Sequence, residues 1–150
     1  MTHAIRIPHF QLAPKAFQGL LALSDTVHKS PLGKRLIDLV LLRVSQINGC
    51  AFCIDMHWAD LIKMGEDPRH LNAVAGWREA PFFTERERAA LRWAELVTNT
   101  PHSDASDEEF ARLRTQFSDA EIADLSYVIV VINSWNLLNV SLRNPVPEQA

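Results

Sequence analysis

The chain has 150 residues, of which 47% are hydrophobic and 22% are charged, and its formal net charge is −3 at pH 7. This balance is typical of a single globular domain, here residues 1–150, and the scattered lysines and arginines argue against a nucleic-acid partner. The apolar runs, such as 39–42 and 127–132, fall far short of the ~20 residues that a membrane-spanning helix needs.

The first 13 residues are predicted to form an N-terminal arm. Apolar residues alternate along it, and Pro8 disfavours a helix. We expect this arm to pack either on its own domain or on a neighbouring subunit. The residues that follow Met1 include no apolar signal core, so the expected location is cytoplasmic.

From Pro14 onward, apolar residues recur with helical spacing, which predicts an all-α fold of six or seven helices. Three S/T-x-x-E capping boxes, beginning at residues 84, 106 and 118, mark helix starts. The β-branched run 128–132 favours a strand by propensity, but its capping box and the lack of a partner strand favour a helix. The predicted helices span residues 14–29, 32–47, 50–64, 68–75, 85–99, 107–117 and 119–142.

The chain's two cysteines lie in the stretch from Asn48 to His57. They are Cys50 and Cys53, and His57 follows four residues after the second. We expect Asn48-Gly49 to end one helix and Cys50 to open the next, which places the three side chains within an arc of ~60° on one helix face. In a reducing compartment, a Cys-x-x-Cys pair is more often catalytic or metal-binding than structural.

Two thiols and an imidazole on one helix face suit redox chemistry. The thiolate is the nucleophile, and a free thiol ionises only near pH ~8.5. The helix N-terminus contributes partial positive charge at Cys50, and His57 can exchange a proton with Cys53. One thiol can attack while the other closes a disulfide. Asp38, twelve residues before Cys50 on the preceding apolar helix, could extend the proton path through water.

These residues resemble the core motif of the alkylhydroperoxidase D (AhpD) family, which belongs to the all-helical carboxymuconolactone decarboxylase-like superfamily. That motif is an acidic residue, eleven residues, and then Cys-x-x-Cys-x-x-x-His. Asp38, Cys50, Cys53 and His57 match it. Residues 132–136 (Ile-Asn-Ser-Trp-Asn) also resemble the family's Asn-x-Trp-Asn segment on its last long helix.

The resemblance covers roughly residues 14–143 and implies a thiol peroxidase or disulfide reductase, an antioxidant oxidoreductase with no bound cofactor. A hydroperoxide would be the substrate, and a protein or small dithiol would donate the electrons. Cys53 would react with the peroxide, and Cys50 would be the more accessible partner that forms mixed disulfides. His57 and Asp38 would form the proton relay. The resemblance also implies a homo-oligomer: a dimer, trimer or hexamer.

The chain departs from the family at two positions. Asp38 stands where a glutamate is usual, and because it is one methylene shorter we expect it to reach the thiol only through water or not at all. Phe52 stands where well-studied peroxidase members have a histidine between the cysteines. Trp135 and Asn136 are expected to serve packing and hydrogen bonding between helices rather than chemistry.

Other interpretations of the cysteine pair remain open. Cys50, Cys53 and His57 supply three zinc ligands, with Asp38, His28 or water as a fourth. In that case the protein would be a non-catalytic zinc-binding or structural assembly module. The cysteines could also be buried small hydrophobic residues. Lyase chemistry, as in superfamily members without the cysteine pair, is disfavoured because both cysteines are present.

Overall fold

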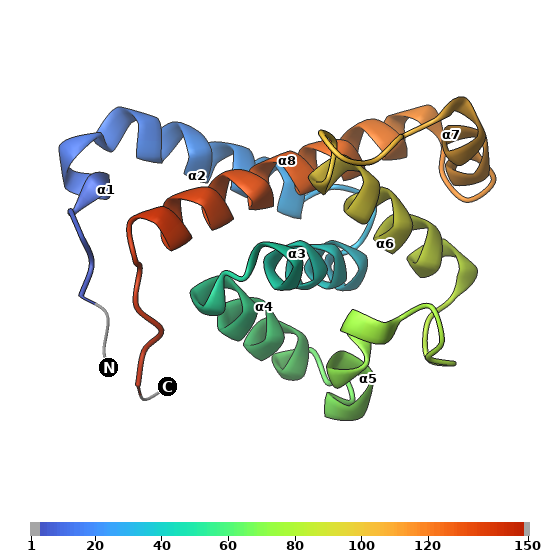
Figure 1. Cartoon of the computed structure of the whole chain (residues 1–150), viewed down its shortest axis with the longest axis horizontal. Helices are drawn as coiled ribbons and strands as arrows, with labels where there is room; N and C mark the ends of the chain where they lie inside the picture. The colour runs from blue at the N-terminus through green and yellow to red at the C-terminus, as the bar shows by residue number, and fades with distance from the viewer. Residues whose placement is uncertain (1–3, 149–150) are drawn as a thin grey trace.

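The computed structural model describes residues 4–148. Within this range the chain forms eight α-helices and one 3₁₀ turn, with no β-strand (Figure 1), which confirms the all-α prediction. The seven predicted helices are all present, and the β-branched run belongs to the last and longest of them. The elements are α1 (His9–Leu12), α2 (Pro14–His28), α3 (Lys34–Asn48), α4 (Ala51–Lys63), α5 (Pro68–Asn72), the 3₁₀ turn (Val74–Gly76), α6 (Glu85–Thr98), α7 (Asp107–Arg114) and α8 (Asp119–Ser141).

Helix α3 is the central element of the molecule (Figure 1). It packs against α8, α4 and α6. Nine of its fifteen residues are buried, because the run 39–42 makes this helix apolar on nearly every side. The helix ends at Gly49, whose φ of 67° lies in the left-handed region that favours glycine. Cys50, the residue that follows Gly49, is buried in the core.

Two of the three predicted capping boxes form completely, at the starts of α6 and α8. In the third, at the start of α7, only one of the two capping hydrogen bonds forms. Ser106 Oγ accepts a hydrogen bond from the Glu109 amide at 3.3 Å. The Glu109 carboxylate turns instead to Arg92, whose Nη2 donates to it at 2.7 Å. A charged hydrogen bond across two helices therefore replaces the local one.

The N-terminal arm differs from the prediction, because Pro8 precedes the one-turn helix α1 instead of preventing it. A proline at a helix start removes no hydrogen bond that the helix needs. The Arg6 amide donates to the Leu142 carbonyl at 2.9 Å, so the arm packs on the end of α8 in its own chain, and the two terminal segments run side by side (Figure 1). Residues 1–3 of the predicted arm lie outside the described residues.

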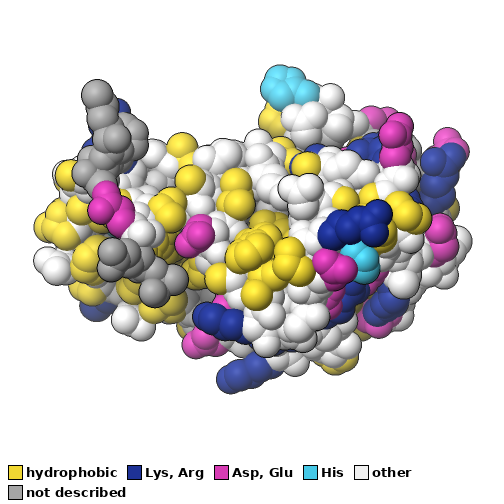
Figure 2. Space-filling model, turned by 90° about the horizontal axis from the view of Figure 1, so that it is seen from below, with side chains coloured by type: hydrophobic (Ala, Val, Ile, Leu, Met, Phe, Trp, Pro, Cys, Tyr) yellow, Lys and Arg dark blue, Asp and Glu magenta, His cyan; other side chains and the backbone are white. Residues whose placement is uncertain are grey.

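The surface carries several large apolar side chains. Helix α4 exposes Met56 and Trp58. Figure 2 views the molecule from its α4 and α5 side and shows hydrophobic side chains gathered on that face. No helix within residues 4–148 is both long enough and apolar enough to cross a membrane. The exposed apolar side chains of α8 are Tyr127, Val130, Leu137 and Val140.

Candidate active site

The turn between α3 and α4 places the two cysteines. Cys50 is the N-cap of α4, and its Sγ accepts a hydrogen bond from the Cys53 amide at 3.3 Å. The two sulfurs form a disulfide, with the Cα atoms 5.3 Å apart. Both residues are buried, at 1% and 0% exposure, so exposure does not distinguish Cys50 as the more accessible partner.

Asn48 fixes this turn to α8. Its Nδ2 donates to Asn133 Oδ1 at 2.9 Å and to Asn136 Oδ1 at 3.1 Å. Trp135 Nε1 donates to Ser24 Oγ on α2 at 2.7 Å. The Asn-x-Trp-Asn segment therefore serves hydrogen bonding between helices, as expected, and it anchors the residue that comes two positions before Cys50.

His57 is a buried histidine on α4 that borders the same cavity as Cys53. It is 5% exposed, and neither ring nitrogen has a hydrogen-bond partner among the described residues. Burial lowers the pKa of His57 from 6.5 to about 4, and the nearby Asp60 carboxylate opposes this shift only in part. The imidazole is therefore neutral at pH 7 and has a lone pair available to accept a proton.

The cavity at Cys53 and His57 has a volume of about 360 Å³. Its walls are mostly apolar and come from α1, α2, α3, α4 and α8. A molecule with an apolar body would bury that body here and meet the polar groups at the sulfur and the imidazole. The large side chains around it include Phe10, Phe17, Leu21, Phe52, Met56 and Trp135.

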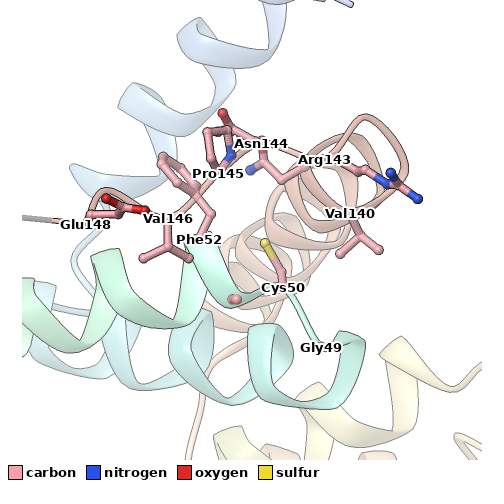
Figure 3. A pocket seen from close by; sticks show the side chains of 11 residues that line it. Gly49, Cys50, Phe52, Val140, Arg143, Asn144, Pro145, Val146 and Glu148 are labelled. Carbon is pink, nitrogen blue, oxygen red and sulfur yellow. The ribbon is translucent and has the colours of Figure 1, made fainter. Parts of the chain in front are cut away.

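A second cavity, of about 600 Å³, borders Cys50. It lies between the α3–α4 turn and the segment that follows α8. Figure 3 shows the Cys50 sulfur pointing into this space, toward Asn144, with Phe52 beside it. Phe52, Asn139 and Asn144 border both cavities. The disulfide therefore lies between two cavities, with Cys53 on the apolar one and Cys50 on the other.

Asp38 is fully buried in α3. Its Oδ2 accepts a hydrogen bond from Lys34, and its Oδ1 lies 3.8 Å from His28 Nε2 without a hydrogen-bond partner among the described residues. Burial raises the pKa of Asp38, and Lys34 opposes that shift. His28 itself borders the cavity of Cys53 and His57. His28 therefore links Asp38 to the cavity, because it contacts the Asp38 carboxyl and borders the cavity itself.

Two residues that the sequence analysis did not select also contact the site. Asn139 Nδ2 lies 3.3 Å from Cys53 Sγ, and Asn144 Nδ2 donates to Asn139 Oδ1 at 3.2 Å. The available signal was the position of Asn139 one turn beyond Asn136 on a helix rich in apolar residues, because a buried amide needs hydrogen-bond partners.

The zinc alternative lacks a set of ligands in this structure. Between residues 4 and 148, no three His, Cys, Asp or Glu side chains gather closely enough to hold a metal ion. The two cysteines are bonded to each other. The Asp38 carboxylate contacts His28 and Lys34 rather than completing a site with the sulfurs.

Comparisons with known sequences give consistent matches. The model of the carboxymuconolactone decarboxylase family matches residues 14–96. The chain is 34% identical over 139 residues to the uncharacterized protein YdfG of Bacillus subtilis, covering 93% of this chain and 95% of YdfG. It is 31% identical over 140 residues to the uncharacterized protein YnjA of Escherichia coli, covering 93% of this chain and 74% of YnjA.

A solved structure shares both fold and sequence with this chain. It is the crystal structure of a protein of unknown function from Agrobacterium tumefaciens, for which an antioxidant defence role as AhpD has been suggested. The two chains are 40% identical and superpose with a TM-score of 0.93. The match covers 97% of this chain and all of that one.

Proposed function

Because this chain belongs to the carboxymuconolactone decarboxylase family and is AhpD-like in sequence and fold, we propose that it is a thiol-dependent peroxidase or disulfide reductase. The observation that carries the proposal is the Cys50–Cys53 disulfide at the start of α4, with the neutral His57 on the same cavity as Cys53. A dithiol that closes within one helical turn can store and release two electrons without a cofactor.

In the proposed oxidative half-reaction, His57 takes the proton of the Cys53 thiol. The thiolate attacks the outer oxygen of a hydroperoxide, an S–O bond forms and the O–O bond breaks. The leaving alkoxide takes the proton from His57 and departs as an alcohol. Cys53 is left as a sulfenic acid. The Cys50 sulfur then attacks the Cys53 sulfur, and water leaves as the disulfide forms.

In the proposed reductive half-reaction, a dithiol donor restores both thiols. One donor thiolate attacks Cys50, which borders the larger cavity, and Cys53 leaves as a thiolate. The second donor thiol then displaces Cys50 and closes the donor's own disulfide. Over the cycle, one hydroperoxide and one dithiol become one alcohol, one water and one disulfide. The donor is a protein or a small dithiol, which the cytoplasm keeps reduced.

The cavity supports organic hydroperoxides as the oxidant class. Its walls are mostly apolar side chains, which stabilise an alkyl or aromatic body by burying it. The His57 imidazole borders the same cavity, and its ring nitrogens have no hydrogen-bond partner among the described residues, so it can interact with the polar hydroperoxide group. Hydrogen peroxide is the smaller oxidant, and it would leave this apolar volume unfilled.

Asp38 is proposed as the outer member of the proton relay. Its carboxyl lies against His28, and His28 borders the cavity that contains His57. Burial raises the pKa of Asp38, which helps this carboxyl to hold and return a proton. We expect Asp38→Asn to slow oxidation by peroxide while the number of thiols oxidised stays unchanged.

Thiol titration tests the proposed function. Reduced, desalted protein receives one equivalent of cumene hydroperoxide, and free thiols are counted before and after. We expect the wild type to go from two thiols to none, and Cys53→Ser to keep its single thiol. The matched Cys50→Ser variant should lose its thiol to a sulfenic acid that dimedone traps. If both wild-type thiols survive the peroxide, the proposal is wrong.

We also propose a homo-oligomer. The exposed apolar side chains of α8, with Leu137 at 70% exposure, are the surface that we expect subunits to share, because exposed apolar patches mark interaction sites.

A further inference from the structure

Asn139 is a buried amide on α8 in direct contact with a reacting sulfur. Its side-chain Nδ2 lies 3.3 Å from Cys53 Sγ, and the residue is 8% exposed. Asn136, the other buried asparagine of α8, donates to Ser45 and accepts from Asn48. Among the described residues, the side-chain partners of Asn139 are the Cys53 sulfur and Asn144.

Asn144 contacts the oxygen end of the Asn139 amide, and the nitrogen end faces the sulfur. An amide oxygen only accepts hydrogen bonds, and an amide nitrogen only donates them. Asn144 Nδ2 donates to Asn139 Oδ1 at 3.2 Å, and the Asn144 backbone amide donates to the Asn139 carbonyl at 2.9 Å. The oxygen is therefore occupied, and the NH₂ group is turned toward Cys53.

The chain reversal after α8 brings Asn144 into this position. Arg143 has a φ of 57°, a left-handed conformation that non-glycine residues rarely adopt. Directly after it, Asn144 folds back beside Cys50 and Phe52 (Figure 3). Uncommon backbone conformations persist where the surrounding structure holds them in place, and the two Asn144–Asn139 hydrogen bonds directly follow this one.

We propose that Asn139 is a catalytic residue whose amide N–H donates to the Cys53 thiolate, and then to the Cys53 sulfenate, while Asn144 is the positioning residue that orients it. The inference rests on the proposed function. A hydrogen bond to an anion is stronger than one to a neutral sulfur. The contact therefore stabilises the thiolate more than it stabilises the disulfide or the thiol.

The surroundings make this donor important. The neutral, buried His57 offers no standing positive charge beside the sulfur. Among the described residues, the other hydrogen-bond donor to the two sulfurs is the Cys53 amide, which reaches Cys50 Sγ rather than Cys53 Sγ. Removing the Asn139 N–H should therefore lower the thiolate fraction of Cys53 at pH 7 by roughly tenfold, the effect of one charge-assisted hydrogen bond.

The test measures ionisation of Cys53 without peroxide. In a Cys50→Ser background Cys53 is the only cysteine of the 150 residues, and the rate of its alkylation by iodoacetamide is followed from pH 5 to 10. We expect Asn139→Ala to move the midpoint up by about one pH unit. Asn139→Asp keeps the shape but replaces the donor with an acceptor, and it should move the midpoint further. Asn144→Ala should move it in the same direction by less.

The control is Ser126→Ala. Ser126 lies on α8, as Asn139 does, but its hydroxyl accepts a hydrogen bond from Trp93 Nε1 and does not contact either sulfur. This substitution should leave the midpoint unchanged even if the protein is less stable. Equal midpoints for the Cys50→Ser parent, both Asn139 variants and the control would overturn the inference, since a purely structural amide would not alter thiol ionisation. If Asn139→Ala does not fold, Asn144→Ala and Asn139→Asp carry the test.

Failure of the inference and failure of the proposed function can be told apart. Unshifted midpoints together with peroxide-driven loss of two thiols would overturn the role of Asn139 and leave the redox cycle intact. Shifted midpoints in a protein that peroxide does not oxidise would support the Asn139–Cys53 contact and refute the cycle.

Discussion

Acidification from pH 7 to pH 5 should lower the free energy of unfolding by about 2 kcal/mol through His57 alone. Burial lowers the pKa of His57 to about 4, against 6.5 for an exposed histidine. Between these two values the unfolded chain binds a proton that the folded chain does not, so stability is present above pH 6.5 and falls as the pH drops toward 4. Each pH unit between these two pKa values changes the free energy of unfolding by ~1.4 kcal/mol. Most of the interval from pH 7 to pH 5 lies between them, so the total change is about 2 kcal/mol.

The assay is urea unfolding of the oxidised protein, followed by circular dichroism at pH 7 and pH 5. His57→Met fills similar volume and does not titrate, so its free energy of unfolding should fall less than that of the wild type by about 2 kcal/mol. His102→Gln, at an exposed position, is the matched control and should retain the wild-type loss.

Asp38 contributes to this pH dependence with the opposite sign. Its raised pKa means that the folded state takes up the proton first, so this carboxyl stabilises the fold as the pH falls through its folded pKa. Because Asp38 is present in all three proteins, its contribution cancels in the comparison. If wild type and His57→Met lose the same free energy, the reasoning about a buried neutral His57 is wrong.

Three further predictions concern stability and assembly. Asn48→Ala should lower the free energy of unfolding by about 1–2 kcal/mol, because two amide oxygens of α8 lose their donor; an unchanged urea midpoint would contradict this. Arg143→Gly should raise the free energy of unfolding by about 1 kcal/mol, since glycine adopts a φ of 57° without strain. Arg143→Val should lower the free energy of unfolding. Leu137→Glu should reduce the mass measured by light scattering to the 17.0 kDa of one chain, with Lys29→Glu as the surface control; a wild type that is already monomeric refutes the oligomer.

The helices and the local part of the site could be predicted from the sequence. Cys50, Cys53 and His57 lie within eight residues, and helical geometry alone places them on one face. The helices follow from apolar spacing and caps. The Glu109 half of one predicted capping box does not form, because Arg92 on another helix binds the Glu109 carboxylate.

The rest of the site depends on tertiary packing. Asn139 comes 86 residues after Cys53, and nothing in the spacing indicates that α8 brings its amide to the sulfur. Likewise, Asp38 reaches the cavity through His28 of α2, a contact that requires knowing how α2 crosses α3. Burial of His57, which decides its charge, is also a property of the assembled helices.

The neutral state of His57 defines what the surrounding residues must do during the proposed redox cycle. In the disulfide form, Cys53 carries no charge, and burial keeps His57 uncharged as well. After reduction, moving the proton from Cys53 to His57 creates two opposite charges in a mostly apolar cavity, where uncompensated charge is costly. Their mutual attraction offsets part of that cost, because an anion near a histidine favours its protonated form. Nearby polar groups offset the rest of the cost of forming these charges. Asp60 favours the imidazolium, and the amide of Asn139 lies at the sulfur. An apolar cavity can therefore bury an organic hydroperoxide and still support a thiolate, provided that these few polar contacts meet the charges where they form.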